Sequence, residues 1–72
     1  MRRVDFTPST RIKLRNEIVR EWVKDGMPRE KAEAIASAEV NRLSIFGPGH
    51  VETIMAGNTV IQVRIKGDIA DE

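Results

Sequence analysis

The stretch FGPGHVETI, residues 46–54, marks the point where the periodicity of the chain changes. Before it, apolar residues recur at helical spacing, and after it they alternate as they do in a strand. Within it, Gly47 can end a helix, Pro48 prevents its continuation, and Gly49 lets the chain reverse. His50, the only histidine, then begins a strand. We therefore interpret the stretch as a structural connector, in preference to a catalytic or ligand-binding loop.

Two helices are predicted before this connector, over residues 8–25 and 28–45. Thr7 can cap the first helix, because its hydroxyl can accept a hydrogen bond from an unpaired backbone N–H. Pro8 suits the first position of that helix, as Pro28 suits the first position of the second. The connection between the helices is short, which favours antiparallel neighbours.

A hairpin is predicted after the connector, over residues 50–66. Its second strand shows the alternation of a half-buried strand. A three-residue loop at Gly57–Thr59 gives the hairpin one shared face, formed by Val51, Thr53, Met55, Ile61, Val63 and Ile65. With this register Glu52 lies opposite Arg64 on the other face, as a favourable cross-strand pair.

A hairpin alone is marginally stable, so the sheet needs a third strand from residues 3–6 or a strand from a partner. The acidic tail, residues 67–72, is expected to be frayed. The prediction is one α+β domain, residues 1–72. Two antiparallel helices pack on a small antiparallel sheet, in the order (β)ααββ.

The expected core takes its members from both helices, the connector and the strands. It comprises Phe6, Ile12, Ile18, Val19, Trp22, Val23, Ile35, Val40, Leu43, Phe46, Ile54 or Met55, Ile61, Val63 and Ile65. Arg15 and Glu39 fall inside the apolar arcs of the two helices. Either they pair at the rim of the helix contact, or each extends its charged end to water.

Composition argues against several kinds of chemistry. The 72 residues include no cysteine, so neither a disulfide nor a zinc site built on thiolates can support a small core. His50 and Glu52 supply two metal ligands where about four are needed. No spacing places a hydroxyl nucleophile beside the histidine. We expect a protein that is not an enzyme, with no cofactor and no small-molecule substrate.

The hydropathy of the chain predicts its cellular compartment. No window reaches the roughly 20 apolar residues that a membrane-spanning helix needs. The two arginines near the start are not followed by the apolar run of a secretory signal. We expect a cytoplasmic protein without a membrane partner.

The expected function is non-catalytic binding of another protein, as a regulatory or accessory module. Small size and the lack of catalytic signals are typical of accessory proteins of phages and mobile elements. An open sheet edge invites strand addition, and the small residues Ala34 and Ala38 allow close approach of a second subunit. The partner is another protein or a second copy in a homodimer. The expected binding residues are Ala34, Ala38, Glu52 and Arg64.

The alternative function is binding of DNA or RNA. Residues 1–24 carry seven basic and three acidic side chains, whereas residues 25–72 carry five basic and eight acidic ones. A basic face on the first helix, together with the hairpin, can contact phosphates. The candidate contacts are Arg2, Arg3, Lys13, Arg20, Lys24, Arg64 and Lys66. Against it, Glu30 and Glu33 would face the groove if the second helix were a recognition helix.

Overall fold

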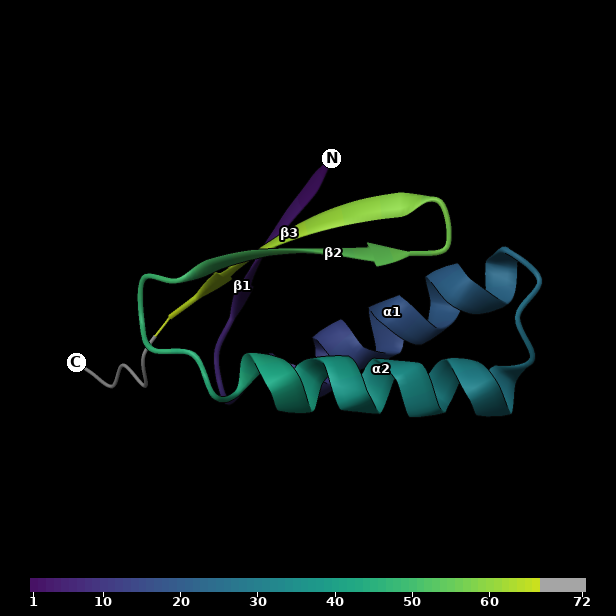
Figure 1. Ribbon diagram of the computed structural model, residues 1–72, viewed down its shortest axis with the longest axis horizontal. Coiled ribbons are helices and arrows are strands. Elements are labelled where there is room, and N and C mark those ends of the chain that lie inside the picture. The colour runs from purple at the N-terminus through teal and green to yellow at the C-terminus, as the bar shows by residue number, and fades with distance from the viewer. Residues whose placement is uncertain (67–72) are drawn as a thin grey trace.

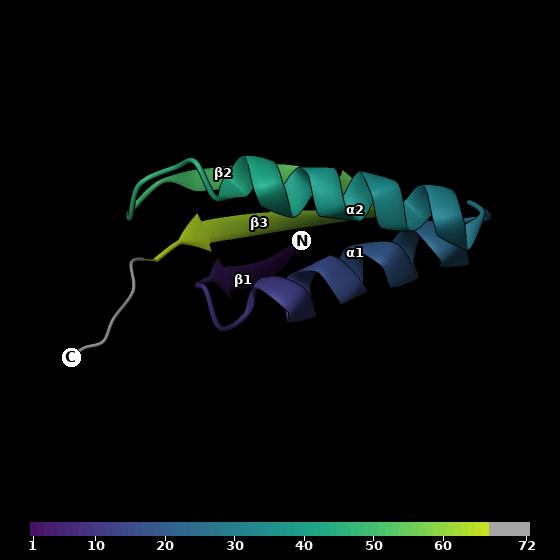
Figure 2. The same cartoon turned by 90° about the horizontal axis from the view of Figure 1, so that it is seen from below.

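The computed structural model describes residues 1–66 and contains two helices and a three-stranded sheet (Figure 1). The elements are β1 (Arg2–Phe6), α1 (Arg11–Lys24), α2 (Arg29–Leu43), β2 (Val51–Ala56) and β3 (Thr59–Ile65). The α+β class and the order βααββ are confirmed, including the N-terminal strand. Both helices lie on the same side of the sheet (Figures 1 and 2). The prediction of a frayed tail concerns residues 67–72, which lie outside the described residues.

The sheet is mixed, with the strand order β1-β3-β2. Strand β2 pairs with β3 antiparallel, as predicted, whereas β1 pairs with β3 in parallel. The prediction of a fully antiparallel sheet is therefore wrong for β1. Parallel neighbours need a long crossover connection, usually a helix. Between β1 and the hairpin, the chain supplies that connection with α1 and α2, which both cover one face of the sheet.

The register of the hairpin differs from the prediction by one residue on β2. Its loop is Gly57–Asn58, because Ala56 pairs with Thr59. Gly57 takes a φ of +60°, and among residues 1–66 only glycines have a positive φ. This is the pattern of a type II′ turn, which favours glycine at its first central position. A one-residue shift moves every side chain of β2 to the opposite face.

The turn takes this form where it packs against the end of α1. A Cβ added at Gly57 would lie 2.6 Å from the carbonyl oxygen of Glu21. The side-chain amide of Asn58 donates a hydrogen bond to Asp25 Oδ1 (3.0 Å), and the hydroxyl of Thr59 donates one to Glu21 Oε1 (3.0 Å). The hairpin loop therefore packs closely against α1, and two side-chain hydrogen bonds hold it there.

Glu21 lies on the inward side of α1 and is almost completely buried. Hydrogen bonding by Thr59 is the main cause that lowers its pKa below the usual value, and Lys24 and Arg2 add to this effect against the opposing effect of burial. Arg2 Nη2 lies 3.4 Å from Glu21 Oε2. Glu21 thus connects β1, α1 and β3 beneath the sheet.

The core lies between the helices and the inner face of the sheet. Its buried members are Phe6, Leu14, Ile18, Val19, Ala32, Ala36, Val40, Leu43, Ile54, Ala56, Ile61, Val63 and Ile65. Trp22 and Phe46 are partly buried against it, and Ile35 is half-buried.

Two residues of α1 were assigned to the core wrongly. Ile12 is 67% exposed and Val23 is 36% exposed. Each residue advances about 100° around a helix, so both lie roughly opposite the buried Leu14. Of the two alternatives in β2, Ile54 is buried and Met55 is exposed.

The start of α1 lies three residues later than predicted. Thr10 precedes the helix, and its backbone carbonyl accepts a hydrogen bond from Leu14 N–H. Residues 7–10 form a turn in which Thr7 N–H donates to Thr10 Oγ1 (2.9 Å) and Thr10 Oγ1 donates to Asp5 O (3.1 Å). These contacts place Thr7 and Pro8 in the turn, so Thr7 does not cap the helix and Pro8 does not start it. Pro28 likewise precedes α2, whose bounds are Arg29–Leu43 in place of the predicted 28–45.

The helices pack antiparallel through polar contacts at their margin. Arg15 Nε donates to Ser37 Oγ (3.2 Å), and Glu39 Oε1 accepts a hydrogen bond from Arg42 Nε (2.8 Å). The first alternative for Arg15 and Glu39, a mutual pair, is therefore wrong. Arg11 donates to Ser44 Oγ (3.0 Å) and ties the start of α1 to the end of α2.

Candidate functional site

The free edge of β2 presents backbone hydrogen-bonding groups that no other strand of residues 1–66 pairs with. β2 is an outer strand of the sheet and pairs only with β3 within this range. Ile65 N–H donates to His50 O (2.8 Å), so the backbone groups of every second residue after His50 also face β3. Val51, Thr53 and Met55 therefore direct their N–H and C=O groups to the free edge.

Both described helices cover one face of the sheet (Figures 1 and 2). Val51, Thr53 and Met55 are exposed and alternate with residues that are buried or half-buried, so their side chains lie on the opposite face. We call Val51, Thr53 and Met55 the outer row. Val51 is 46% exposed and Met55 is 59% exposed. Val60, opposite Met55, adds a half-buried apolar side chain. Strand addition draws affinity from backbone hydrogen bonds and specificity from alternate side chains, and the outer row offers both.

The outer row was not predicted, because the expected register placed these residues on the core face. The predicted pair of Glu52 and Arg64 is wrong for the same reason, since Val51 lies opposite Arg64 and Glu52 lies opposite Val63. A local signal for the correct register was available in the Gly57–Asn58 dipeptide, because glycine followed by another residue suits a two-residue II′ loop.

Glu52 points to the helix side of the sheet and joins a polar cluster there. Its Oε2 accepts a hydrogen bond from Arg42 Nη1 (2.8 Å), and its Oε1 lies 2.7 Å from His50 Nε2. Arg42 also contacts Glu39 Oε1 (2.6 Å). The ring of His50 stacks on Phe46, with centroids 3.9 Å apart and planes 7° from parallel.

Electrostatics in this cluster favour the charged forms of Glu52 and Arg42. Hydrogen bonding by His50, and then by Arg42, lowers the pKa of Glu52 below its usual value. Hydrogen bonds to Glu52 and then to Glu39 raise the pKa of Arg42. The cluster fastens the start of β2 to the end of α2. It gives His50 contacts with Phe46 and Glu52, and His50 precedes β2, which begins at Val51, one residue later than predicted.

The predicted alanine site lies on a different surface. Ala34 and Ala38 are exposed on the side of α2 that faces away from the core, whereas Ala32 and Ala36 are completely buried. Ala34 and Ala38 have small side chains, and their backbone N–H and C=O groups form the hydrogen bonds of α2.

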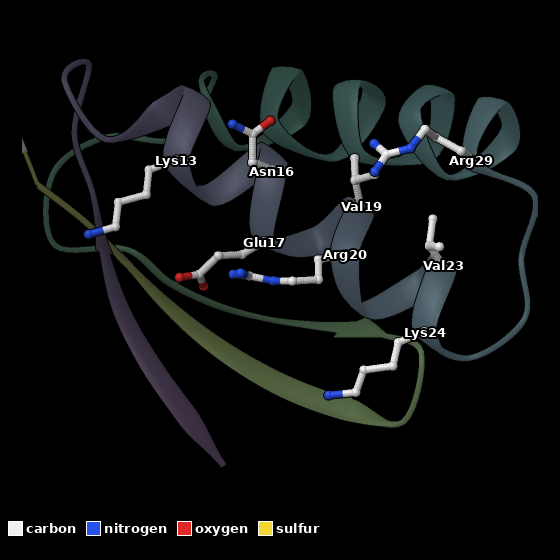
Figure 3. Close-up of a pocket in the computed structure, with 8 residues that line it drawn as sticks. All are labelled: Lys13, Asn16, Glu17, Val19, Arg20, Val23, Lys24 and Arg29. Atoms are coloured by element: carbon white, nitrogen blue, oxygen red, sulfur yellow. The ribbon is translucent and has the colours of Figure 1, made fainter.

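The predicted basic residues are divided between surfaces. Lys13, Arg20 and Lys24 line a shallow depression of about 620 Å³ along α1, and Figure 3 shows their side chains on one flank of the helix. Glu17 and Arg29 line it too. This part of the predicted basic face is therefore assembled in the folded chain.

The other predicted basic residues do not extend that depression. Arg2 Nη1 lies 3.2 Å from Glu17 Oε1, and its Nη2 contacts Glu21, so its charge is compensated. Arg3 and Arg64 alternate with inward-facing residues and lie on the outer face of the sheet. Lys66 is exposed after β3, 3.9 Å from Asp5 Oδ2.

Within residues 1–66, no three His, Cys, Asp or Glu side chains are placed to hold a metal ion together. Neither helix in this range combines the length and the apolar character that crossing a membrane requires. Comparison of the chain with protein families, curated proteins and solved structures finds no significant match.

Proposed function

We propose that this protein is a non-catalytic protein-binding module that acts as a regulatory or accessory component. The binding surface is the free edge of β2 with the outer row beside it. One observation carries the proposal: within the described residues, 1–66, an unpaired strand edge is flanked by exposed apolar side chains on a sheet face without a helical cover. Natural proteins commonly protect such edges with charged residues, proline or covering elements.

The composition of β2 supports this choice. The strand, VETIMA, contains no lysine, arginine or proline. Its one charged side chain, Glu52, faces the helices and pairs with Arg42. The edge thus lacks the usual features that discourage the addition of another strand.

A charge-matched pair of variants tests the site. Val51→Lys with Met55→Lys adds two positive charges beside the edge, and Ala34→Lys with Ala38→Lys adds two on the exposed side of α2. Each full-length variant would be immobilised and challenged with nuclease-treated native lysate, after circular dichroism shows a native fold. We expect the β2 variant to lose most of the protein captured by the wild type and the α2 variant to retain it. Equal capture by all three proteins would contradict the proposal, and loss confined to the α2 variant would move the site to the alanines.

Nucleic-acid binding is the second candidate, and the depression along α1 is the observation that favours it. Within residues 1–66, Lys13 and Arg20 form no ion pair. Lys24 Nζ lies 3.9 Å from Glu21 Oε1. Three cations on one flank can follow a phosphate backbone. The compensated charge of Arg2 and the carboxylate of Glu17 in the same depression weaken this candidate.

Salt dependence separates the two candidates. A nucleic-acid complex held by about three phosphate contacts loses affinity steeply as salt rises. Labelled duplex DNA and single-stranded RNA would be titrated with the wild type, Arg20→Glu and Lys31→Glu. The Lys31 variant makes the same charge change on the exposed surface of α2. The second candidate is supported if binding weakens with salt and if Arg20→Glu reduces it while Lys31→Glu does not. It is rejected if no binding occurs at low salt.

A further inference from the structure

We propose that the occupant of the β2 edge is β2 of a second copy, which joins antiparallel and extends the two sheets into one sheet of six strands. This inference rests on the proposed function and names its partner. A second copy is a more specific partner than the proposed function requires, because a protein-binding edge can also receive a strand from an unrelated protein.

The outer row is complementary to itself about Thr53. In an antiparallel pair centred there, Thr53 lies opposite the partner's Thr53, and Val51 lies opposite the partner's Met55. The three residues that direct backbone groups outward are then in register with the same three residues of the second copy. Each opposed pair exchanges two hydrogen bonds, so this edge can form six. An interface of this kind is isologous and closes after two subunits.

Charge does not oppose this arrangement. The three residues of the outer row are uncharged, so the twofold axis brings no like charges together beside the new strand pair. Glu52 projects to the helix side, where Arg42 contacts it at 2.8 Å. The two apolar pairs of valine and methionine cover the outer side of the joined strands. Cross-strand apolar pairs stabilise neighbouring strands.

The opposite edge of the sheet is a poorer site for a second copy. Lys66 N–H donates to Phe6 O (3.0 Å), so in β1 only Arg3 and Asp5 direct backbone groups outward. The carbonyl of Asp5 already accepts a hydrogen bond from Thr10 Oγ1. β1 therefore offers fewer free groups than β2, and charged side chains stand beside them.

A row of residues across the sheet allows a quantitative test. Arg3, Gln62 and Thr53 are neighbours in register on β1, β3 and β2. Strands lie about 4.8 Å apart, so in the six-stranded sheet the two Thr53 residues are roughly 5 Å apart, the two Gln62 residues roughly 14 Å and the two Arg3 residues roughly 24 Å. The separation grows by two strand spacings at each step. Only side-by-side pairing of β2 strands gives this series.

The chain has no cysteine, so a single introduced cysteine reports on one position. Thr53→Cys, Gln62→Cys and Ala34→Cys would be treated with a short bis-maleimide, and Gln62→Cys and Arg3→Cys would be spin-labelled for distance measurement. We expect rapid cross-linking at residue 53 only and the two longer distances in the predicted order. Cross-linking confined to Ala34→Cys, or equal distances at residues 62 and 3, would overturn the inference.

Thr53→Pro gives an independent measure by analytical ultracentrifugation. Its N–H faces the free edge, so proline removes no hydrogen bond to β3 and is tolerated in an edge strand. We expect the variant to keep the native circular dichroism spectrum and to dimerise more than tenfold less tightly than the wild type. A wild type that stays monomeric at millimolar concentration refutes the second copy as the occupant. The proposed function then still stands or falls by the capture experiment with the lysine variants.

Discussion

Replacing Gly57 by alanine tests how closely the hairpin loop packs on α1. The new methyl group would lie 2.6 Å from the carbonyl oxygen of Glu21 and 3.1 Å from Asp25 Cβ, and the residue would keep a φ of +60°. The positive φ alone costs about 1–2 kcal/mol for a residue with a Cβ. Relief of the steric overlap by movement of the loop adds about 1–3 kcal/mol.

Two other glycines separate these contributions. Gly49 has a φ of +93° and nothing within 4 Å of an added Cβ, whereas Gly47 has neither a positive φ nor a close neighbour. We expect Gly49→Ala to lower the free energy of unfolding by about 1–2 kcal/mol. Gly47→Ala should change it by less than about 0.5 kcal/mol. Gly57→Ala should lower it by about 2–5 kcal/mol, a large share of the roughly 4–11 kcal/mol that a chain of this length has.

Urea denaturation followed by circular dichroism and Trp22 fluorescence measures all three variants at neutral pH. The difference between Gly57→Ala and Gly49→Ala isolates the contact between the loop and the helix. If these two variants agree within about 0.5 kcal/mol, the close approach of Gly57 to α1 is refuted.

The remaining predictions concern the core, the two alanine surfaces and acid stability. Ile61→Ala should cost about 2–5 kcal/mol in urea denaturation, whereas Ile12→Ala, at a 67% exposed site, should cost less than about 0.5 kcal/mol; equal costs would contradict the assigned core. Ala36→Leu overfills a completely buried site and should cost about 1–3 kcal/mol, and Ala38→Leu on the exposed side of the same helix should be close to neutral. Glu52 has a lowered pKa when folded, so its contribution is present above its unfolded pKa and is lost as pH falls through the folded pKa. In Glu52→Gln the melting temperature should therefore fall less than in the wild type between roughly pH 5 and pH 3, and parallel profiles would exclude this linkage.

The candidate site was predictable only in part. An open sheet edge follows from the small number of strands in the sequence, and the structure has one on each side. The residues that form the β2 edge did not follow, because shifting a strand by one residue exchanges its two faces. Val51, Met55 and Ile54 are all apolar, so hydrophobic alternation alone could not choose between the two registers.

Local patterns in the sequence determined the types and order of the elements. Helical spacing before Pro48, alternation after Gly49 and the turn residues between them depend on neighbours a few positions apart, and the folded chain agrees with all three. Tertiary structure alone decided the parallel pairing of β1 and the inward position of Glu21, and packing selected the register of β2 that the Gly57–Asn58 dipeptide also favours. These features depend on contacts between distant segments, above all the approach of Gly57 to α1, and no local periodicity records such contacts.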